Sequence, residues 1–315
     1  MSTIEKALAK QKEAKLKKQN EANNEVSHVE SSDLSDMSST APEPNNNTVN
    51  QVSAEQQRQL DAEVRSIPSD KKIILNGERL TERGFIYGVN STHHIQEEFR
   101  HIKRKLLNNA FGAAAKTLNH SNLIMVSSTN PNEGKTYVSI NLALSIALEQ
   151  DKTVLLIDSD VLRPSLHREL EFESSEGLLE FLLSEVDDLS DIIYSTNLDN
   201  LKIIPAGKPH HLTNELLASN RMEKLAKELA ERYPDRIVIF DCPPILGVTE
   251  TPVLSNLVGQ AIIVVEESKT KLEDVKKASC QLNEDMAIGF VMNKTINTKR
   301  DGYGYYGYGY GKQNQ

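Results

Sequence analysis

The segment from residue 123 to residue 293 alternates short, largely apolar runs with longer segments of helical period. Strands that are apolar on both faces belong to sheets covered on both sides, and strands separated by helices pair in parallel. We therefore predict an α/β fold in which helices flank a mostly parallel sheet. Strands are expected at 123–127, 153–158, 201–204, 236–241, 260–265 and 287–293, and helices at 135–150, 214–232 and 271–284.

One more helix is predicted ahead of this segment, at 93–107. Its apolar residues Ile95, Phe99, Ile102 and Leu106 recur at helical spacing, which predicts one buried face. We expect this helix to begin the folded part of the chain.

The chain before Phe85 contains no aromatic residue, and residues 31–50 are mostly small and polar. Such a composition buries too little apolar surface to offset the entropy of ordering, so 19–65 is predicted to be disordered. Residues 2–5 have the spacing of a capping box, which predicts a short helix at the start of the chain. The expected domains are an N-terminal region at 1–84, a folded domain at 85–298 and a tail at 299–315.

The strand expected at 123–127 leads into the sequence STNPNEGKT and then into a helix. This order is typical of a P-loop NTPase, because loop amides and the helix N-terminus hold phosphates. Lys135 would reach the β and γ oxygens, and the Thr136 hydroxyl would ligate Mg²⁺. The first glycine of the GxxxxGK[ST] pattern is replaced by Thr129, and a bare GKT is common by chance. The nucleotide-binding residues predicted here are Thr129, Asn130, Pro131, Asn132, Glu133, Gly134, Lys135, Thr136 and Tyr137, with Asp241 from a later strand.

Acidic residues close two of the predicted strands. Asp158 and Asp160 follow the run at 153–157, and Asp241 follows the run at 237–240. The carboxyl ends of parallel strands meet at the ligand-binding edge of an open α/β sheet. Mg²⁺ prefers oxygen ligands and keeps several waters, so Thr136, Asp160 and Asp241 are the predicted metal ligands, partly through water. Asp158 would then be free to accept a proton, although a single aspartate here is more often a turn residue.

The tail from 301 to 311 reads DGYGYYGYGYG and holds five of the nine tyrosines of the chain. Composition alone fits an adhesive low-complexity segment equally well. Beside an ATP site, tyrosines are better explained as phosphate acceptors. The predicted acceptors are Tyr303, Tyr305, Tyr306, Tyr308 and Tyr310.

Charge and cysteine content exclude several classes of protein. The chain has 36 basic and 45 acidic residues, a net charge of −9, so nucleic acid is not an expected partner. Two cysteines and no apolar leader indicate a reducing, cytoplasmic compartment. The apolar runs are much shorter than the roughly 18 residues that span a bilayer, so no crossing is expected.

These motifs together resemble the bacterial tyrosine autokinases of capsule and exopolysaccharide synthesis, a P-loop branch related to the MinD and ParA ATPases. The likeness covers about 95–311 and includes the phosphate loop, the sequences IDSDVLRPSLH and IVIFDCPP, and the tyrosine tail. The segment EEFRHIKRKLL is similar to the family's ExxRxxR oligomerisation helix, with Glu97, Arg100 and Lys103 at the matching positions. The likeness is greatest to the cytoplasmic kinases that are separate from their membrane partner.

The resemblance implies an ATP- and Mg²⁺-dependent kinase domain at 85–298 that phosphorylates its own tail. Lys135, Asp158 and Asp160 would be catalytic, with Asp158 as the base, although spacing alone does not separate Asp158 from Asp160. The family forms rings that come apart when the tails are phosphorylated. Its partners are a membrane-bound chain-length protein, which would recruit the kinase to the inner face of the membrane, and a tyrosine phosphatase.

Several positions depart from the family pattern. Lys103 replaces an arginine, and Asn130 replaces the signature lysine of MinD and ParA. Leu162 stands where many members have the arginine of DxDxR, with Arg163 next to it, so the role of that arginine stays open. The Asn130 difference favours a kinase over a positioning ATPase of the MinD and ParA kind. Thr129 and Leu162 leave open a third hypothesis, a nucleotide-sensing scaffold of polysaccharide export without catalysis.

Overall fold

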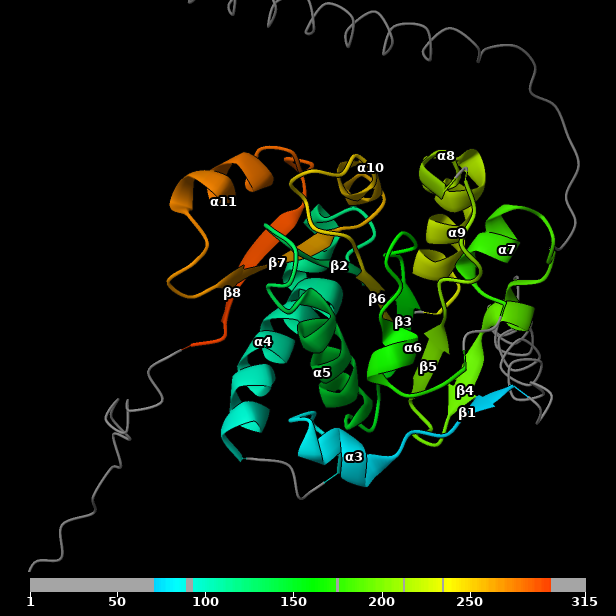
Figure 1. The fold of residues 1–315 in the computed structure, drawn as a ribbon, viewed down its shortest axis with the longest axis horizontal. Coiled ribbons are helices and arrows are strands. Elements are labelled where there is room, and N and C mark those ends of the chain that lie inside the picture. Colours follow the sequence, from blue (N-terminus) through cyan, green and yellow to red (C-terminus); the bar gives the residue numbers. More distant parts are fainter. Residues whose placement is uncertain (1–70, 89–92, 174–175, 212, 234, 296–315) are drawn as a thin grey trace, which may run out of the picture. The chain divides into compact units, whose positions relative to one another are not determined.

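The computed structural model describes residues 71–88, 93–173, 176–211, 213–233 and 235–295. Within them the strands form one eight-stranded sheet in the order β1-β4-β5-β3-β6-β2-β7-β8 (Figure 1). The strands are β1 (Lys72–Ile73), β2 (Leu123–Ser128), β3 (Thr153–Asp158), β4 (Tyr194–Thr196), β5 (Leu201–Ile204), β6 (Arg236–Asp241), β7 (Gln260–Glu266) and β8 (Ala287–Asn293).

The sheet is mostly parallel, as the sequence predicts. Strands β5, β3, β6, β2, β7 and β8 all pair in parallel, whereas β4 runs antiparallel to β5 and carries β1 beside it. In the β3–β6 pair, Asp158 lies opposite Asp241. This register brings both carboxylates to one edge of the sheet.

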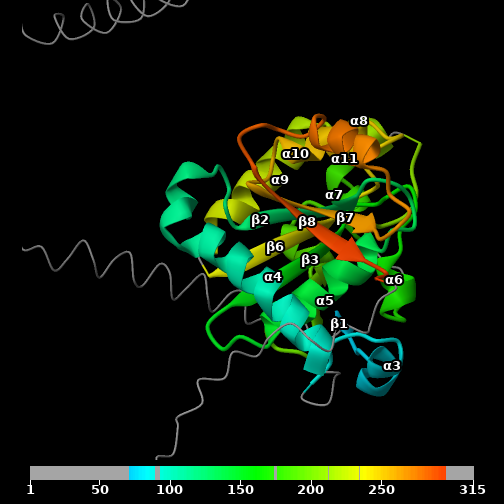
Figure 2. The same cartoon turned by 90° about the vertical axis from the view of Figure 1, so that its left-hand side faces the viewer.

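Helices cover both faces of the sheet, and Figure 2 shows α4 and α5 on one side of the strands and α8–α11 on the other. The helices are α3 (Gly77–Glu82), α4 (His93–Phe111), α5 (Lys135–Ala147), α6 (Leu166–Glu169), α7 (Leu178–Leu182), α8 (Thr213–Leu217), α9 (Asn220–Glu231), α10 (Glu250–Ser255) and α11 (Leu272–Ser279), with short 3-10 turns at Ala113–Thr117 and Leu189–Ile192. None of the described helices is both long and apolar enough to cross a membrane.

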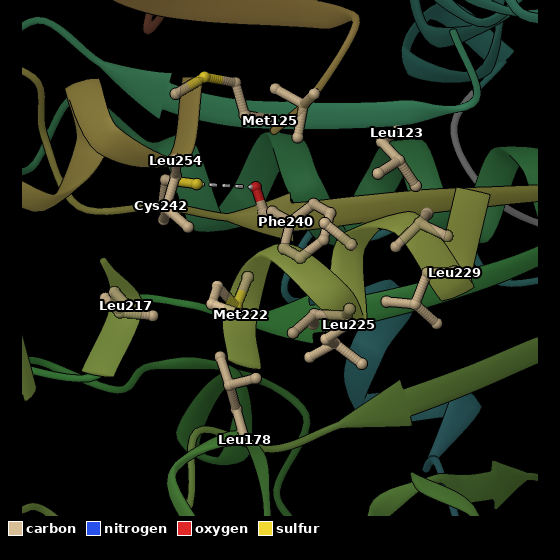
Figure 3. Packing of buried hydrophobic residues seen from close by; sticks show 14 of the residues in the cluster. Leu123, Met125, Leu178, Leu217, Met222, Leu225, Leu229, Phe240, Cys242 and Leu254 are labelled. Carbon is tan, nitrogen blue, oxygen red and sulfur yellow. Dashed lines mark hydrogen bonds between the residues drawn. The ribbon is translucent and has the colours of Figure 1, made fainter. Parts of the chain in front are cut away.

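Each face of the sheet has its own hydrophobic core. One core packs Leu80, Phe99 and Ile140 from α3, α4 and α5 against the strands. The other packs α7–α10 against the opposite face, and Figure 3 shows Met222 and Phe240 at its centre. Burial of each Leu or Phe side chain stabilises the folded state by about 1.5–3 kcal/mol. The two cores therefore fix the sheet, and with it the positions of the strand ends.

The folded domain begins earlier than the predicted boundary at residue 85. Strand β1 and helix α3 lie before it, and Ile73 and Leu80 belong to the core. The prediction of a single helix at 214–232 is also wrong, because the helix is interrupted between α8 and α9. At that break the Ser219 side chain caps α9 by accepting from the amide of Met222 at 3.3 Å. The predicted N-terminal helix, the predicted disorder at 19–65 and the tyrosine tail lie outside the described residues.

Candidate active site

The phosphate loop joins the end of β2 to the start of α5. At its last position Gly134 has a φ of +97°, a conformation that L side chains rarely adopt. A Cβ atom at Gly134 would lie 2.1 Å from Nδ2 of Asn293. Both the backbone conformation and the close approach of Asn293 therefore require glycine here.

The loop is fixed by hydrogen bonds that do not involve a ligand. The buried Glu133 carboxylate accepts from the amide of Asn130 at 2.9 Å and from the hydroxyl of Thr270 at 2.5 Å. The carbonyl of Glu133 accepts from Nδ2 of Asn293 at 2.8 Å. Thr270 from the turn after β7 and Asn293 from the end of β8 thus hold the loop from outside, which places its amides in advance of binding.

Lys135 points into the edge of the sheet where the aspartates gather. Its Nζ lies 2.8 Å from Oδ2 of Asp160 and 3.8 Å from Oδ2 of Asp241, and its side chain is 13% exposed. Burial opposes the charge, but the carboxylates of Asp241 and Asp160 outweigh it and raise the pKa of Lys135. Lys135 is therefore not a solvated lysine at a helix start.

Asp241 is held by hydroxyl groups from the first turns of α5. Thr136 Oγ1 donates to Oδ2 of Asp241 at 2.8 Å, and Ser139 Oγ donates to Oδ1 at 3.0 Å. Thr136 Oγ1 also lies 2.8 Å from Oγ of Ser165. A hydroxyl and a carboxylate oxygen in contact are the pair that Mg²⁺ takes up beside nucleotide phosphates.

Asp158 has one carboxylate oxygen in use and one without a partner. Its Oδ2 accepts from the amides of Ser165 and Leu166, each at 3.1 Å. Its Oδ1 is buried and has no hydrogen-bond partner among the described residues. Burial, reinforced by the charge of Asp241, raises the pKa of Asp158 to about 8.

A cleft of about 330 Å³ opens above these groups, which is within the usual range for a small-molecule site. Its walls come from the phosphate loop, the start of α5 and the segment 160–169. Besides Asp158, the buried hydroxyls of Thr129 and Ser159 have no partner among the described residues. Unpartnered polar atoms beneath an open phosphate cradle fit a bound nucleotide with Mg²⁺.

The three aspartates do not form a metal site on their own. Within the described residues, no three His, Cys, Asp or Glu side chains converge as metal ligands. Mg²⁺ at this edge would be held by Thr136, Asp160 and Asp241 together with phosphate oxygens and water, as the sequence predicts.

The structure brings together the predicted site residues of the described chain. Pro131, Asn132, Gly134 and Tyr137 line the cleft with Lys135, Thr136 and Asp160. Thr129 is buried, and Asn130 serves as the brace on Glu133. The structure places Arg163, the arginine next to Leu162, in the cleft, and it adds cleft residues that the sequence did not indicate, namely Ser165, Arg168, Glu169 and Pro244. Ser139 could have been predicted as a site residue from the sequence, because it lies four residues after Lys135 in the same helix.

The three residues of the predicted oligomerisation motif divide into two kinds. Glu97 and Arg100 are exposed and form an ion pair with each other on α4. Lys103 is 6% exposed, and its Nζ donates to the carbonyl of Ser145 at 2.8 Å and pairs with Glu149. Lys103 thus fastens α4 to the end of α5 within the chain.

A parallel sheet, a phosphate loop and acidic strand ends at one edge define a P-loop NTPase, and the AAA-domain family matches residues 121–286. The tyrosine-protein kinase YwqD of Bacillus subtilis (strain 168) is 34% identical over 186 residues, which cover 58% of this chain and 77% of YwqD. Staphylococcus aureus CapB, also named as a tyrosine-protein kinase, is 30% identical over 214 residues, which cover 67% of this chain and 90% of CapB.

A solved structure is similar as well. The kinase domain of the Escherichia coli tyrosine kinase ETK matches with a TM-score of 0.54 and 27% identity, covering 67% of this chain and 80% of that domain. The chain belongs to the bacterial tyrosine-protein kinase family and is similar to its members YwqD and CapB.

Proposed function

We propose that this protein is an ATP-dependent tyrosine autokinase that phosphorylates the C-terminal tail of a neighbouring copy. The observation that carries the proposal is the position of Lys135, 2.8 Å from Asp160 and 3.8 Å from Asp241 at the end of the phosphate cradle. Membership of the tyrosine kinase family and the five tyrosines of the tail support the choice of acceptor.

The substrate ATP supplies the phosphoryl group, and Mg²⁺ neutralises its charge when bound. In this proposal the loop amides and Lys135 hold the β and γ phosphates. Thr136, Asp160 and Asp241 hold the metal, partly through water. Catalysis by these groups is positioning and charge stabilisation, which is the main demand of phosphoryl transfer.

Asp158 is the proposed base. Its buried Oδ1 has no partner among the described residues and belongs to the strand end that lies opposite Asp241, while the amides of Ser165 and Leu166 fix its other oxygen. The bond from the tyrosyl oxygen to the γ phosphorus forms as the β–γ bridging bond breaks, and ADP leaves. The tyrosyl proton passes to Oδ1 of Asp158 in the ionised form of that carboxyl, which its raised pKa makes a stronger base than an ordinary aspartate.

The proposed acceptors are the tail tyrosines at 303, 305, 306, 308 and 310. Glycines between them impose little restriction on φ, which lets a peptide of this sequence enter a narrow cleft. Transfer between copies also gives the exposed Glu97 and Arg100 of α4 a role, as contacts that bring two copies together.

The proposed process is the control of capsule or exopolysaccharide polymerisation and export. The kinase would act in the cytoplasm, recruited to the inner face of the membrane by a membrane-bound chain-length protein and reset by a tyrosine phosphatase. This part of the proposal rests on the family resemblance and on the similarity to CapB.

Transfer between copies is tested by mixing two variants, neither of which can phosphorylate its own tail. The Lys135→Met variant keeps its tail tyrosines, whereas a variant with all five tail tyrosines replaced by Phe, the five-Phe variant, keeps its active site. With ATP and Mg²⁺, phosphotyrosine is expected on Lys135→Met only when the five-Phe variant is present. ATP hydrolysis without phosphotyrosine would instead assign a positioning ATPase, and nucleotide binding without either activity would assign a scaffold.

A further inference from the structure

Two arginines line the cleft outside the phosphate cradle. Arg163 lies in the turn after β3, and Arg168 lies on α6. Both residues are exposed, and neither guanidinium has an ion pair or hydrogen bond to another described residue. Leu162, the neighbour of Arg163, is 52% exposed and does not line the cleft.

The acidic side chains near Arg168 form ion pairs with arginines on and directly after α3. Glu169 pairs with Arg83, the residue that caps the end of α3, and Glu171 pairs with Arg79 of α3 at 2.7 Å. These contacts turn both carboxylates toward α3. The positive charge of Arg168 is therefore left without a counter-ion at the cleft.

The acid beside Arg163 is also occupied. Asp160 pairs with Lys135 at 2.8 Å, and its Oδ1 accepts from the backbone amide of Arg163 at 3.2 Å. This turn holds the backbone of Arg163 next to the reacting edge and leaves its guanidinium unpaired. Two uncompensated positive charges at one opening stand out in a chain with a net charge of −9.

We propose that Arg163 and Arg168 bind a phosphotyrosine that the acceptor tail already carries, while a neighbouring tyrosine receives the next phosphate. The inference rests on the proposed function and names part of its substrate. Guanidinium groups bind phosphate through paired hydrogen bonds, and a phosphotyrosine carries about −1.5 to −2 charge. Two guanidinium groups therefore match one phosphate.

The spacing of the tail suits such a second contact. Successive tyrosines are never more than two residues apart, and an extended peptide advances about 3.3 Å per residue. A phosphate on the next tyrosine would then lie roughly 6–7 Å from the reacting one. Arginine side chains span such a distance. The γ phosphate already has Lys135 and the loop amides, so the exposed pair is left for the peptide.

The pair would make later phosphorylations faster than the first. It would also set a limit, because a second or third phosphate on the same tail finds no further free guanidinium there. Those phosphates would add negative charge to a chain with a net charge of −9, and repulsion would favour release of a heavily phosphorylated tail.

The test uses the full-length five-Phe variant as enzyme, so that its own tail does not compete. Two peptides of sequence 301–311 are compared, one with phosphotyrosine at position 308 and one with Tyr308→Phe, so that both keep the same four acceptors. The KM of the phosphopeptide is expected to be at least tenfold lower. Adding Arg163→Ala and Arg168→Ala should bring the two KM values within twofold and leave the KM for ATP unchanged.

Two further variants separate charge from geometry. Arg163→Lys with Arg168→Lys keeps the charge but loses the planar fork, so an intermediate preference is expected. Lys224→Ala with Lys227→Ala removes two exposed charges from α9, on the other face of the sheet, and should leave the preference intact.

Equal KM values for the two peptides with the parent enzyme would overturn the inference. So would a rise in the KM for ATP with the peptide preference preserved, which would assign the arginines to the γ phosphate. If neither peptide is phosphorylated, the proposed kinase function is wrong. A binding measurement then tests the inference separately. Fluorescence anisotropy of the labelled phosphopeptide with ADP and Mg²⁺ should still show a tenfold preference that the double alanine variant loses, and absence of that preference would overturn the inference.

Discussion

Thr136 Oγ1 donates a hydrogen bond of 2.8 Å to Oδ2 of Asp241, which joins the first turn of α5 to the end of β6. These two residues are 105 positions apart in the chain. Their contact exists because β2 and β6 are neighbours in the sheet and both end at the same edge. The proposed metal position is therefore a consequence of strand order.

The three aspartates should fail in different ways when each is changed to asparagine. Asp158→Asn removes the proton acceptor and is expected to lower kcat by about 10²–10⁴ while sparing nucleotide affinity. Asp160→Asn and Asp241→Asn remove oxygen ligands and should weaken binding of ATP in the presence of Mg²⁺. Calorimetric titration beside a transfer assay measures both effects. Equal loss of affinity in all three variants would reject this division of roles.

The pKa of Asp158 predicts how stability depends on pH. This group titrates at about 8 in the folded protein, against 3.8 for an ordinary aspartate, so the folded state holds a proton that the unfolded chain releases between these values. Its contribution to stability is complete below pH 4 and is lost as the pH rises to 8. Asparagine does not titrate. Without nucleotide and with chelator present, Asp158→Asn should therefore have a higher Tm than the wild type at pH 8, by about 2–4 °C for each kcal/mol of stability that the wild type has lost.

The gap in Tm between wild type and Asp158→Asn should shrink steadily toward pH 4. Asp187→Asn is a suitable control, because the Asp187 side chain is 95% exposed. A gap for Asp158→Asn that stays constant with pH would show that the buried carboxyl keeps an ordinary pKa.

Much of this fold is predictable from the sequence, because the central strands are buried on both faces and are therefore apolar along their whole length. Strands β3, β5, β6 and β8 match their predicted bounds, and β2 and β7 are each one residue longer. Strands β1 and β4 escaped prediction. Each has three residues or fewer, and they pair across about 120 positions, so neither leaves a local periodic signal.

The candidate site also contains residues that the sequence predicts and residues that it does not. The GKT sequence and the aspartates after apolar runs carry local signals, and the structure brings them together. Thr270, in the turn after β7, and Asn293, at the end of β8, brace the loop through single contacts, and nothing in their local sequence indicates this. The sequence shows Arg163 beside Leu162, but the unpaired charges of Arg163 and Arg168 depend on Arg79 and Arg83, which pair with the neighbouring acids from a distant part of the chain.

Lys103→Met is expected to affect stability. The change leaves the carbonyl of Ser145 and the carboxylate of Glu149 without their buried partner, at a cost of about 1–3 kcal/mol. Thermal unfolding should show a lower Tm, whereas light scattering should show an unchanged assembly. Unchanged Tm with a smaller assembly would instead place Lys103 in a contact between copies.

Arg100→Ala is expected to change the assembly and to leave the stability unchanged. Arg100 is exposed, and its pairing with Glu97 within one helix contributes only about 0.2–0.5 kcal/mol, so the Tm should hardly change. The mass measured by light scattering should fall whether or not the tail is phosphorylated. In the wild type, phosphorylation should also lower the mass, because five phosphotyrosines add roughly −8 to −10 charge to an acidic chain. A mass that is unchanged by phosphorylation would mean that the tail signals to another protein.

The most direct test of the central claim is to incubate the purified protein with ATP and Mg²⁺ and to map its phosphates by mass spectrometry. The wild type is expected to carry phosphate on tyrosines of 303–310, and Lys135→Met should carry at least about 100-fold less while keeping the wild-type circular dichroism spectrum. Lys227→Met, which changes an exposed lysine on α9, serves as the control and should match the wild type. Wild-type levels of phosphotyrosine in Lys135→Met, or no phosphate on the tail of the wild type, would contradict the account.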